Sequence, residues 1–160
     1  MADKARGALR VKTPEDARGN EHTFTPKIRV LVADDHALFR RGVRAFLSGI
    51  SGLEVIGEAT SGSELLAAAG SGHPDVVLMD LMMPGSPAPE IIKELRRLSP
   101  PTRVIALSGY YDAPLVTQVL QAGASGYFLK TSDPAHVADA IRRVCRGEQA
   151  LDPCLVPMLI

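Results

Sequence analysis

Five polar side chains follow four different apolar runs of the sequence, at the positions where strands would end. They are the acid pair Asp34 and Asp35, the single acid Asp80, the hydroxyl of Ser108 and the amine of Lys130. Carboxylates held close together repel one another unless a cation lies between them. A hard divalent ion such as Mg²⁺ binds a few carboxylates and keeps positions for water and phosphate. These residue types therefore predict chemistry on a phosphoryl group beside a metal ion.

Each of these residues also has an ordinary structural explanation. Asp34 or Asp35 can cap the helix that follows it, and Asp80 and Ser108 can be turn residues before nearby glycines. Lys130 can be a solvated charge at the end of a strand. Taken one by one, these explanations do not account for the presence of all five residues at the ends of four strands. The acids, the hydroxyl and the lysine occur in the order that a phosphoryl site needs. We therefore favour the site over the separate structural roles.

The elements that must position these residues are indicated by short apolar runs that alternate with helical periodicity. Strands are expected at 28–33, 53–59, 75–79, 103–107 and 125–129. Most of their positions are apolar in succession, as in parallel strands covered on both faces. Because helical segments separate the strands, we predict a doubly wound α/β domain with right-handed crossovers. Ligands bind beyond the carboxyl ends of such strands, where the strand order reverses.

Amphipathic stripes and capping residues indicate the helices. The stripes are Phe39, Val43, Phe46 and Leu47; Ile91, Leu95 and Leu98; and Val137, Ile141, Val144 and Cys145. Asp112 before Pro114, and Asp133 before Pro134, predict helix starts, since aspartate caps a helix and proline fits its first turn. Gly147 predicts the end of the last helix.

Composition and charge disfavour several classes of function. Among 160 residues, 18 are basic and 18 acidic, so the chain has no overall basic field for a nucleic acid backbone. No apolar run approaches the roughly 18 residues that cross a bilayer, so we expect no membrane association. Cys145 and Cys154 have no partners in zinc spacing and fit a reducing compartment. We expect a cytoplasmic protein that does not bind DNA through this chain alone.

Composition also predicts where the folded part begins. Residues 1–27 are rich in charged residues, glycine and proline and poor in aliphatic residues, so we expect a disordered tail. A start codon assigned too far upstream is the open alternative. The folded domain is expected at 28–148.

Four motifs in this folded part are similar to those of the receiver domains of bacterial two-component response regulators. They are VLVADDHALFRRG, DVVLMDLMMPG, VIALSG and GASGYFLK. The resemblance covers essentially all of 28–148. It implies a flavodoxin-like (βα)5 fold with a five-stranded parallel sheet in the order 2-1-3-4-5.

The resemblance also implies a metal site and a phosphoacceptor. Asp80 would be the phosphorylation site. Asp34, Asp35 and Asp80 would bind Mg²⁺ together with the backbone carbonyl of Met82. A sensor histidine kinase would supply the phosphoryl group. The chain would catalyse only its own phosphorylation and a slow autodephosphorylation, so we do not expect an enzyme.

The remaining matched residues would form the switch. Ser108 and Lys130 would contact the phosphoryl oxygens, and Tyr127 would be the rotating aromatic. From its position alone, Tyr127 is equally a core aromatic with its hydroxyl at the rim. We expect Ser108 to move toward the phosphoryl group and to open space for Tyr127 to turn inward.

The subfamily resemblance concerns the output. ADDHALFRRG, GASGYFLK and the non-proline Thr131 look most like the NarL/FixJ subfamily, which implies control of transcription through a LuxR-type helix-turn-helix. Residues 149–160 are expected to begin a linker, and DNA would be bound only through an output domain absent from this chain. A receiver fragment, a stand-alone regulator and a truncated one are left open. A homodimer formed on phosphorylation is open as well.

One segment departs from the family pattern, and two other functions were weighed. The family usually has Asp-Gly in the segment after MPG, whereas residues 86–90 read Ser-Pro-Ala-Pro-Glu, which stiffens the loop beside Asp80. A phosphate-independent module with the same fold predicts gaps in the acid set, and the set is complete. A phosphohydrolase or nucleotide enzyme predicts a D-x-D, G-x-G-x-x-G or P-loop motif, and none occurs.

Overall fold

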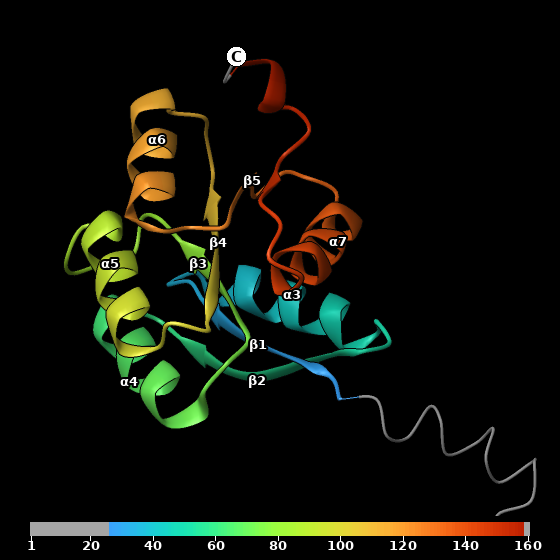
Figure 1. Ribbon diagram of the computed structural model, residues 1–160. Coiled ribbons are helices and arrows are strands. Elements are labelled where there is room, and N and C mark those ends of the chain that lie inside the picture. The colour runs from blue at the N-terminus through green and yellow to red at the C-terminus, as the bar shows by residue number, and fades with distance from the viewer. Residues whose placement is uncertain (1–25, 159–160) are drawn as a thin grey trace, which may run out of the picture.

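The computed structural model describes residues 26–158, so nearly all of the expected disordered tail lies outside the described residues. A parallel sheet of six strands, in the order β2-β1-β3-β4-β5-β6, forms the middle layer (Figure 1). The strands are β1 (Ile28–Ala33), β2 (Leu53–Ala59), β3 (Val76–Asp80), β4 (Arg103–Ser108), β5 (Gly126–Leu129) and β6 (Ala150–Leu151). The helices are α3 (Ala37–Ser48), α4 (Gly62–Gly72), α5 (Ala88–Leu98), α6 (Ala113–Ala122) and α7 (Pro134–Cys145), followed by the 3-10 turn η1 (Val156–Met158).

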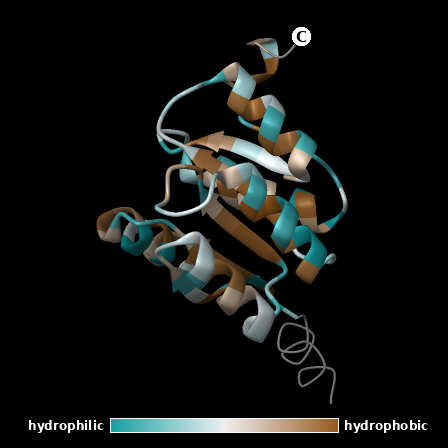
Figure 2. Cartoon of the chain, turned by 90° about the vertical axis from the view of Figure 1, so that its left-hand side faces the viewer, coloured by the Kyte–Doolittle hydropathy of each residue, from teal (hydrophilic) through white to brown (hydrophobic). Residues whose placement is uncertain are grey.

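Helices cover both faces of the sheet, which confirms the predicted doubly wound fold. Helices α4, α5 and α6 lie on one face, and α3 and α7 lie on the other (Figure 1). A hydrophobic core lies on each face of the sheet, and alternate residues of β3 pack into one core or the other, because successive side chains of a strand point to opposite faces. Val77 and Met79 pack with the three-helix face, and Val76 and Leu78 pack with α3 and α7. In Figure 2 the strand segments between the helices are accordingly mostly hydrophobic.

The strand bounds differ little from those expected, but the differences involve site residues. β1 and β2 begin and end at the predicted residues. β3 and β4 each extend one residue further than predicted, so Asp80 and Ser108 are the last residues of their strands. Their backbones are thus fixed by the sheet ladder, with Asp80 paired to Leu107 of β4.

The predicted order of the first five strands is confirmed, and β6 extends it at the edge of β5. Gly126 of β5 pairs with Ala150 of β6. A Cβ atom at position 126 would lie 2.6 Å from the carbonyl oxygen of Ala150, so glycine is what allows the two strands to pair. A two-residue strand has no readable periodicity, and the sequence therefore predicted only a linker at 149–160. That assignment stays a prediction, although ordered packing continues beyond residue 148.

Asp152 fastens the segment after β6 to the loop between β5 and α7. Its side chain is 1% exposed. Oδ2 accepts hydrogen bonds from the Leu129 N–H, at 3.0 Å, and from the Ser132 hydroxyl, and Oδ1 accepts one from the Cys154 N–H at 3.0 Å. Leu155, 1% exposed, then packs into the core on the side of α4 to α6. Lys130 thus lies in the chain between Leu129 and Ser132, two residues that donate hydrogen bonds to Asp152.

The predicted helix caps are confirmed at three positions. Asp112 accepts a hydrogen bond from the Leu115 N–H and begins α6, and Asp133 accepts one from the Ala135 N–H and begins α7. Gly147 has a φ of 86° just after the end of α7, a conformation that favours glycine. Leu98 and Cys145, predicted members of two stripes, are exposed at the last residues of their helices. Among the described helices, none has the length and apolarity needed to cross a bilayer.

Candidate functional site

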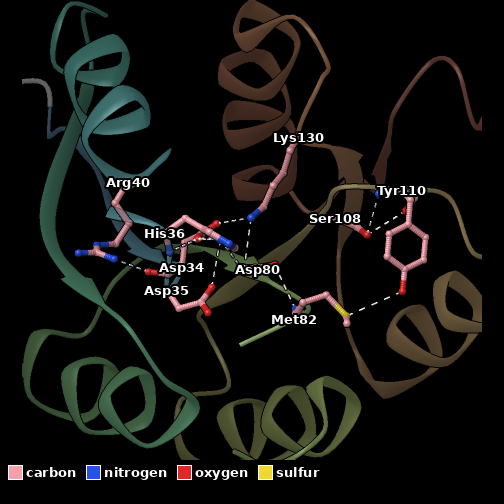
Figure 3. A network of polar contacts seen from close by, with 9 residues as sticks. All are labelled: Asp34, Asp35, His36, Arg40, Asp80, Met82, Ser108, Tyr110 and Lys130. Carbon is pink, nitrogen blue, oxygen red and sulfur yellow. Dashed lines mark hydrogen bonds and ion pairs between the residues drawn. The ribbon is translucent and has the colours of Figure 1, made fainter. Parts of the chain in front are cut away.

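The carboxyl ends of the central strands bring the predicted residues to one edge of the sheet. β1 and β3 are neighbours, with β2 on the far side of β1, so the strand order reverses between them. Asp34 follows β1 and Asp80 ends β3 at this reversal point. Lys130 follows β5 and its side chain extends back toward both acids (Figure 3).

Four side chains form an acidic cluster at the reversal point. Asp34, Asp35, His36 and Asp80 each offer one donor atom, and these atoms all lie within 4.8 Å of one another. Asp34 and Asp80 are 1% exposed, whereas the Asp35 side chain is 31% exposed. The structure thus confirms that the three predicted acids are brought together. They form a site with a buried floor and an open side.

Two oxygens of this cluster have unusual surroundings. Oδ2 of Asp34 and Oδ2 of Asp80 are buried, and neither accepts a hydrogen bond from a described residue. Buried polar atoms are normally satisfied, so each such atom calls for an explanation. The partner that the described chain supplies is a cation, the Lys130 ammonium, whose Nζ lies 2.6 Å from Asp34 Oδ2 and 3.4 Å from Asp80 Oδ2. Three carboxylates against one ammonium leave the site negative, and its oxygen donors fit a further hard cation.

Lys130 is held between the acids and an aromatic ring. Its side chain is 17% exposed. Nζ lies 4.6 Å from the centre of the Phe39 ring, which is cation–π distance. The ammonium is therefore restrained on the apolar side by Phe39 of α3 and on the polar side by Asp34 and Asp80. The alternative that Lys130 is a solvated strand-end charge is wrong.

The electrostatics of Asp80 follow from its burial. Loss of solvent raises the pKa of Asp80, and the nearby negative charge of Asp34 raises it further. The Met82 N–H, which donates a hydrogen bond to Oδ1 at 3.0 Å, and the Lys130 ammonium both lower the pKa but do not cancel the rise. Without a metal ion, the surrounding donors and the Lys130 ammonium thus do not fully balance the negative charge of ionised Asp80. A bound cation would balance it.

The turn after β1 is held by hydrogen bonds to Asp34. Its Oδ1 accepts a hydrogen bond from the His36 N–H at 2.7 Å, and its backbone carbonyl accepts one from Arg40 Nη1 at 2.7 Å. Arg40 Nε also donates to Glu58 Oε1 at 3.2 Å, which ties α3 to β2. The alternative that Asp34 or Asp35 caps α3 is wrong, because His36 occupies the capping position and no side chain among residues 26–158 caps that helix.

His36 is the site residue that sequence reasoning missed. Its Nδ1 lies 3.1 Å from Asp34 Oδ1, 3.1 Å from Asp35 Oδ1 and 4.0 Å from Asp80 Oδ2. The sequence assigned no role to any of the four histidines, which are scattered along the chain. The available signal was its position directly after the acid pair.

The structure places the predicted switch residues around one backbone carbonyl, that of Tyr110. The buried Ser108 hydroxyl donates to this carbonyl at 2.8 Å, and the Tyr127 hydroxyl lies 3.3 Å from the same oxygen. Ser108 therefore faces Tyr110 and not Asp80 (Figure 3). Tyr127 is 0% exposed, and burial raises its pKa. The expectation that Tyr127 must turn inward needs correction, because its ring is already part of the core.

The loop after β3 borders the site on its open side. Met82 is 57% exposed, and its sulfur lies 3.9 Å from the Tyr110 hydroxyl. Pro87 precedes the first residue of α5 and Pro89 lies in its first turn, where proline is tolerated because the N–H groups have no helical partner. The role expected for the Met82 carbonyl stays a prediction.

Comparisons with known proteins agree with this geometry. A family model described as response regulator receiver domain matches residues 30–142. The response regulator GacA of Pseudomonas viridiflava is 43% identical over 132 residues, which cover 82% of this chain and 62% of GacA. The transcriptional regulatory protein LiaR of Bacillus subtilis (strain 168) is 47% identical over 126 residues, which cover 78% of this chain and 59% of LiaR. The chain thus spans about three fifths of the length of these relatives.

Solved structures show the same fold. A LuxR-family two-component response regulator from Aurantimonas sp. SI85-9A1 aligns with a TM-score of 0.79 and 29% identity over 83% of this chain and 95% of that chain. The signal receiver domain of a NarL response regulator from Mycobacterium tuberculosis aligns with a TM-score of 0.74 and 37% identity, over 77% of this chain and 99% of that one.

Proposed function

The chain belongs to the response regulator receiver family of two-component systems, and on that premise we propose that Asp80 is its phosphoacceptor. The observation that carries the proposal is the pair of buried carboxylates, Asp34 and Asp80, whose Oδ2 atoms share the Lys130 ammonium and accept no hydrogen bond from the described chain. A carboxylate fixed at a strand end can act as a covalent phosphoryl acceptor, because transfer depends mainly on positioning and charge neutralisation.

The residues present fit a divalent magnesium ion. We propose that Asp34, Asp35 and Asp80 hold it together with the backbone carbonyl of Met82. The fit rests on the oxygen donors of the acidic cluster and on its excess negative charge. Bound Mg²⁺ would neutralise charge that develops on the phosphoryl oxygens.

The chemical step places the phosphoryl group between Asp80 and its donor. We propose a phosphohistidine of a sensor histidine kinase as the donor. A carboxylate oxygen of Asp80 forms the new bond to phosphorus, while the bond from phosphorus to the donor imidazole breaks and its electron pair leaves with the imidazole, which takes up a proton from water. Lys130, already 3.4 Å from Asp80 Oδ2, balances charge on the transferred oxygens.

The response to phosphorylation is proposed to begin at Ser108. An acyl phosphate at Asp80 adds negative charge and strong acceptor oxygens. Ser108 would exchange the Tyr110 carbonyl for a phosphoryl oxygen, which alters the loop before α6 and leaves that carbonyl to Tyr127. Moving a switch from mostly off to mostly on takes about 5.5 kcal/mol of differential stabilisation.

The output is proposed from the relatives. LiaR is a transcriptional regulatory protein, and we propose that this receiver also controls transcription, with DNA contacted through a LuxR-type helix-turn-helix region. The sequence in hand has a formal net charge of zero, which gives the receiver no overall attraction for DNA.

Intact-mass measurement after incubation with acetyl phosphate and Mg²⁺ tests the proposal. Wild-type protein is expected to gain one phosphoryl group, and Asp80→Asn is expected to gain none. Undiminished labelling of Asp80→Asn, or no labelling of wild type, would defeat the assignment. Continuous release of inorganic phosphate over many turnovers would instead indicate a phosphohydrolase.

A further inference from the structure

The acidic cluster contains an imidazole nitrogen as well as carboxylate oxygens. We propose that His36 binds the metal through Nδ1 and thereby gives the site a preference for an imidazole-binding divalent transition ion, of which Ni²⁺ is the test case, over Mg²⁺. The inference rests on the proposed function, since it concerns the same metal site, but it adds a ligand and a class of ion that the family resemblance does not supply.

The spacing of the donor atoms carries the first step. With metal bonds of about 2.1 Å, ligand atoms at right angles lie about 3.0 Å apart and opposite ligand atoms about 4.2 Å apart. His36 Nδ1 lies 3.1 Å from Asp34 Oδ1, 3.1 Å from Asp35 Oδ1 and 4.0 Å from Asp80 Oδ2. These separations match two adjacent pairs and one opposite pair around a single ion.

Two arrangements fit this position of the ring. A protonated Nδ1 would share its one hydrogen between the two carboxylates, both at 3.1 Å, whereas an unprotonated Nδ1 would face their oxygens with a lone pair and need a cation between them. An ion bound by all three groups would satisfy both contacts. The Lys130 ammonium accompanies Oδ2 of Asp34 and of Asp80, at 2.6 Å and 3.4 Å, but three carboxylates against this one ammonium leave negative charge that a further cation would balance.

The backbone holds His36 in place. Its N–H donates to Asp34 Oδ1 at 2.7 Å, and the residue occupies the position just before the first turn of α3. The imidazole therefore follows from the same turn that orients Asp34. Its side chain is 66% exposed, which leaves the ring accessible to an ion from solvent.

The chemistry of the ligands determines which ion binds more tightly when an imidazole is added to the site. Carboxylate, carbonyl and water suit Mg²⁺, whereas imidazole suits Ni²⁺, Cu²⁺ and Zn²⁺. Ni²⁺ also binds more tightly than Mn²⁺ in the general order of divalent ions, and octahedral spacing suits it. Adding one imidazole to an oxygen site is thus expected to raise Ni²⁺ affinity more than Mg²⁺ affinity.

Calorimetric titration of Ni²⁺ and of Mg²⁺ into the full chain tests the proposal, with wild type compared with His36→Gln. His36→Gln is expected to lower Ni²⁺ affinity at least tenfold more than it lowers Mg²⁺ affinity, about the smallest change that altered ligand support produces. His136→Gln is the matched control for adventitious binding, because His136 is exposed on α7 and does not belong to the acidic cluster. A loss that is equal for both ions, or equal in the two variants, would overturn the proposal.

Electron spin echo spectroscopy of bound Mn²⁺ gives a second measurement, independent of affinity. Wild type is expected to show modulation from a directly bound ¹⁴N nucleus, and His36→Gln is expected to lack it. An identical spectrum in both proteins would show that the imidazole is not a ligand. Failure of the proposed function is read separately, since wild-type protein that takes up no phosphoryl group in Mg²⁺ defeats the phosphoacceptor assignment whatever the Ni²⁺ result.

Discussion

The ammonium of Lys130 lies closer to Asp34 than to the proposed phosphoacceptor, with Nζ at 2.6 Å from Asp34 Oδ2 and 3.4 Å from Asp80 Oδ2. In the unmodified protein, Lys130 thus pairs mainly with Asp34, a proposed metal ligand, and is only partly engaged with Asp80. Phosphoryl oxygens on Asp80 would compete with Asp34 for this ammonium. The lysine therefore has a structural role in the unmodified protein, apart from its proposed role in catalysis.

Replacing Lys130 by methionine is expected to destabilise the metal-free protein. The substitution leaves two buried carboxylates without their cation, and breaking a buried ion pair costs about 3 kcal/mol of unfolding free energy. Urea unfolding in EDTA measures the loss. Lys93→Met, at an exposed position of α5, is the control and should change stability by no more than about 0.5 kcal/mol. Similar losses in both variants would contradict the ion-pair assignment.

Asp80→Asn is expected to stabilise the protein in the absence of a metal ion. Burial raises the pKa of Asp80, so at neutral pH its ionised form disfavours the folded state, and removal of the charge should raise unfolding free energy by on the order of 1 kcal/mol. Mg²⁺ should stabilise wild type by mass action and the variant much less. Urea unfolding with and without Mg²⁺ checks both effects. A variant less stable than wild type in EDTA would be the contrary result.

Asp152 predicts a dependence of stability on pH. Burial alone would raise its pKa, but hydrogen bonds from Ser132, the Leu129 N–H and the Cys154 N–H hold the pKa below the ordinary value of 3.8. Its contribution to stability is therefore complete above pH 3.8 and is lost as pH falls through the lower pKa of the folded state. Asp152→Asn should cost about 2 kcal/mol at neutral pH. The difference from wild type, measured by urea unfolding, should narrow as the pH is lowered below 3.8, and a constant difference would refute the linkage.

Ser108→Ala is expected to weaken the conformational response while Asp80 still accepts a phosphoryl group. The substitution removes one hydrogen bond to a charged group, about 1.5–3 kcal/mol, from the roughly 5.5 kcal/mol that a full switch needs. Amide chemical shifts of α6, β5 and α7 should therefore move only part of the way on phosphorylation. A complete shift in the phosphorylated variant would show that the Ser108 hydroxyl does not couple the site to that face.

Gly126→Ala tests the attachment of β6. The added Cβ would lie 2.6 Å from the Ala150 carbonyl oxygen, so the two strands must separate, at a cost of about 1–3 kcal/mol. Gly70→Ala in α4 is the matched control, because a Cβ there meets nothing within 4 Å and alanine favours helix by roughly 1 kcal/mol. Urea unfolding should therefore show changes of opposite sign. Two variants of equal stability would argue against tight pairing at β6.

The sheet and most of the site follow from local sequence patterns. β1 and β2 match their predicted bounds because runs rich in aliphatic residues end at the polar residues Asp34 and Thr60, and the caps Asp112 and Asp133 act within their own helices. The convergence of Asp34 and Asp80 follows from strand order alone, since both stand at carboxyl ends of neighbouring parallel strands.

The features that sequence did not predict depend on contacts between distant segments or on the direction of one side chain. Asp152 reads as an ordinary turn residue before a proline, and only the fold places it against Leu129 and Ser132. The direction of the His36 ring follows a backbone hydrogen bond to Asp34, and the core position of Tyr127, one of two interpretations of the sequence, is accompanied by a contact of its hydroxyl with the Tyr110 carbonyl. Neither contact has a periodic signal.

β3 lies between β1 and β4, and all five of its residues are buried. Amide hydrogens in such a strand exchange with solvent only when the whole domain opens, whereas loops open locally at little cost in free energy. The backbone that positions the Asp80 carboxylate therefore belongs to a strand that opens rarely, and local opening of the surrounding loops leaves its orientation unchanged. Motion on the timescale of signalling is left to the exposed segments that border it, including the one that carries Met82.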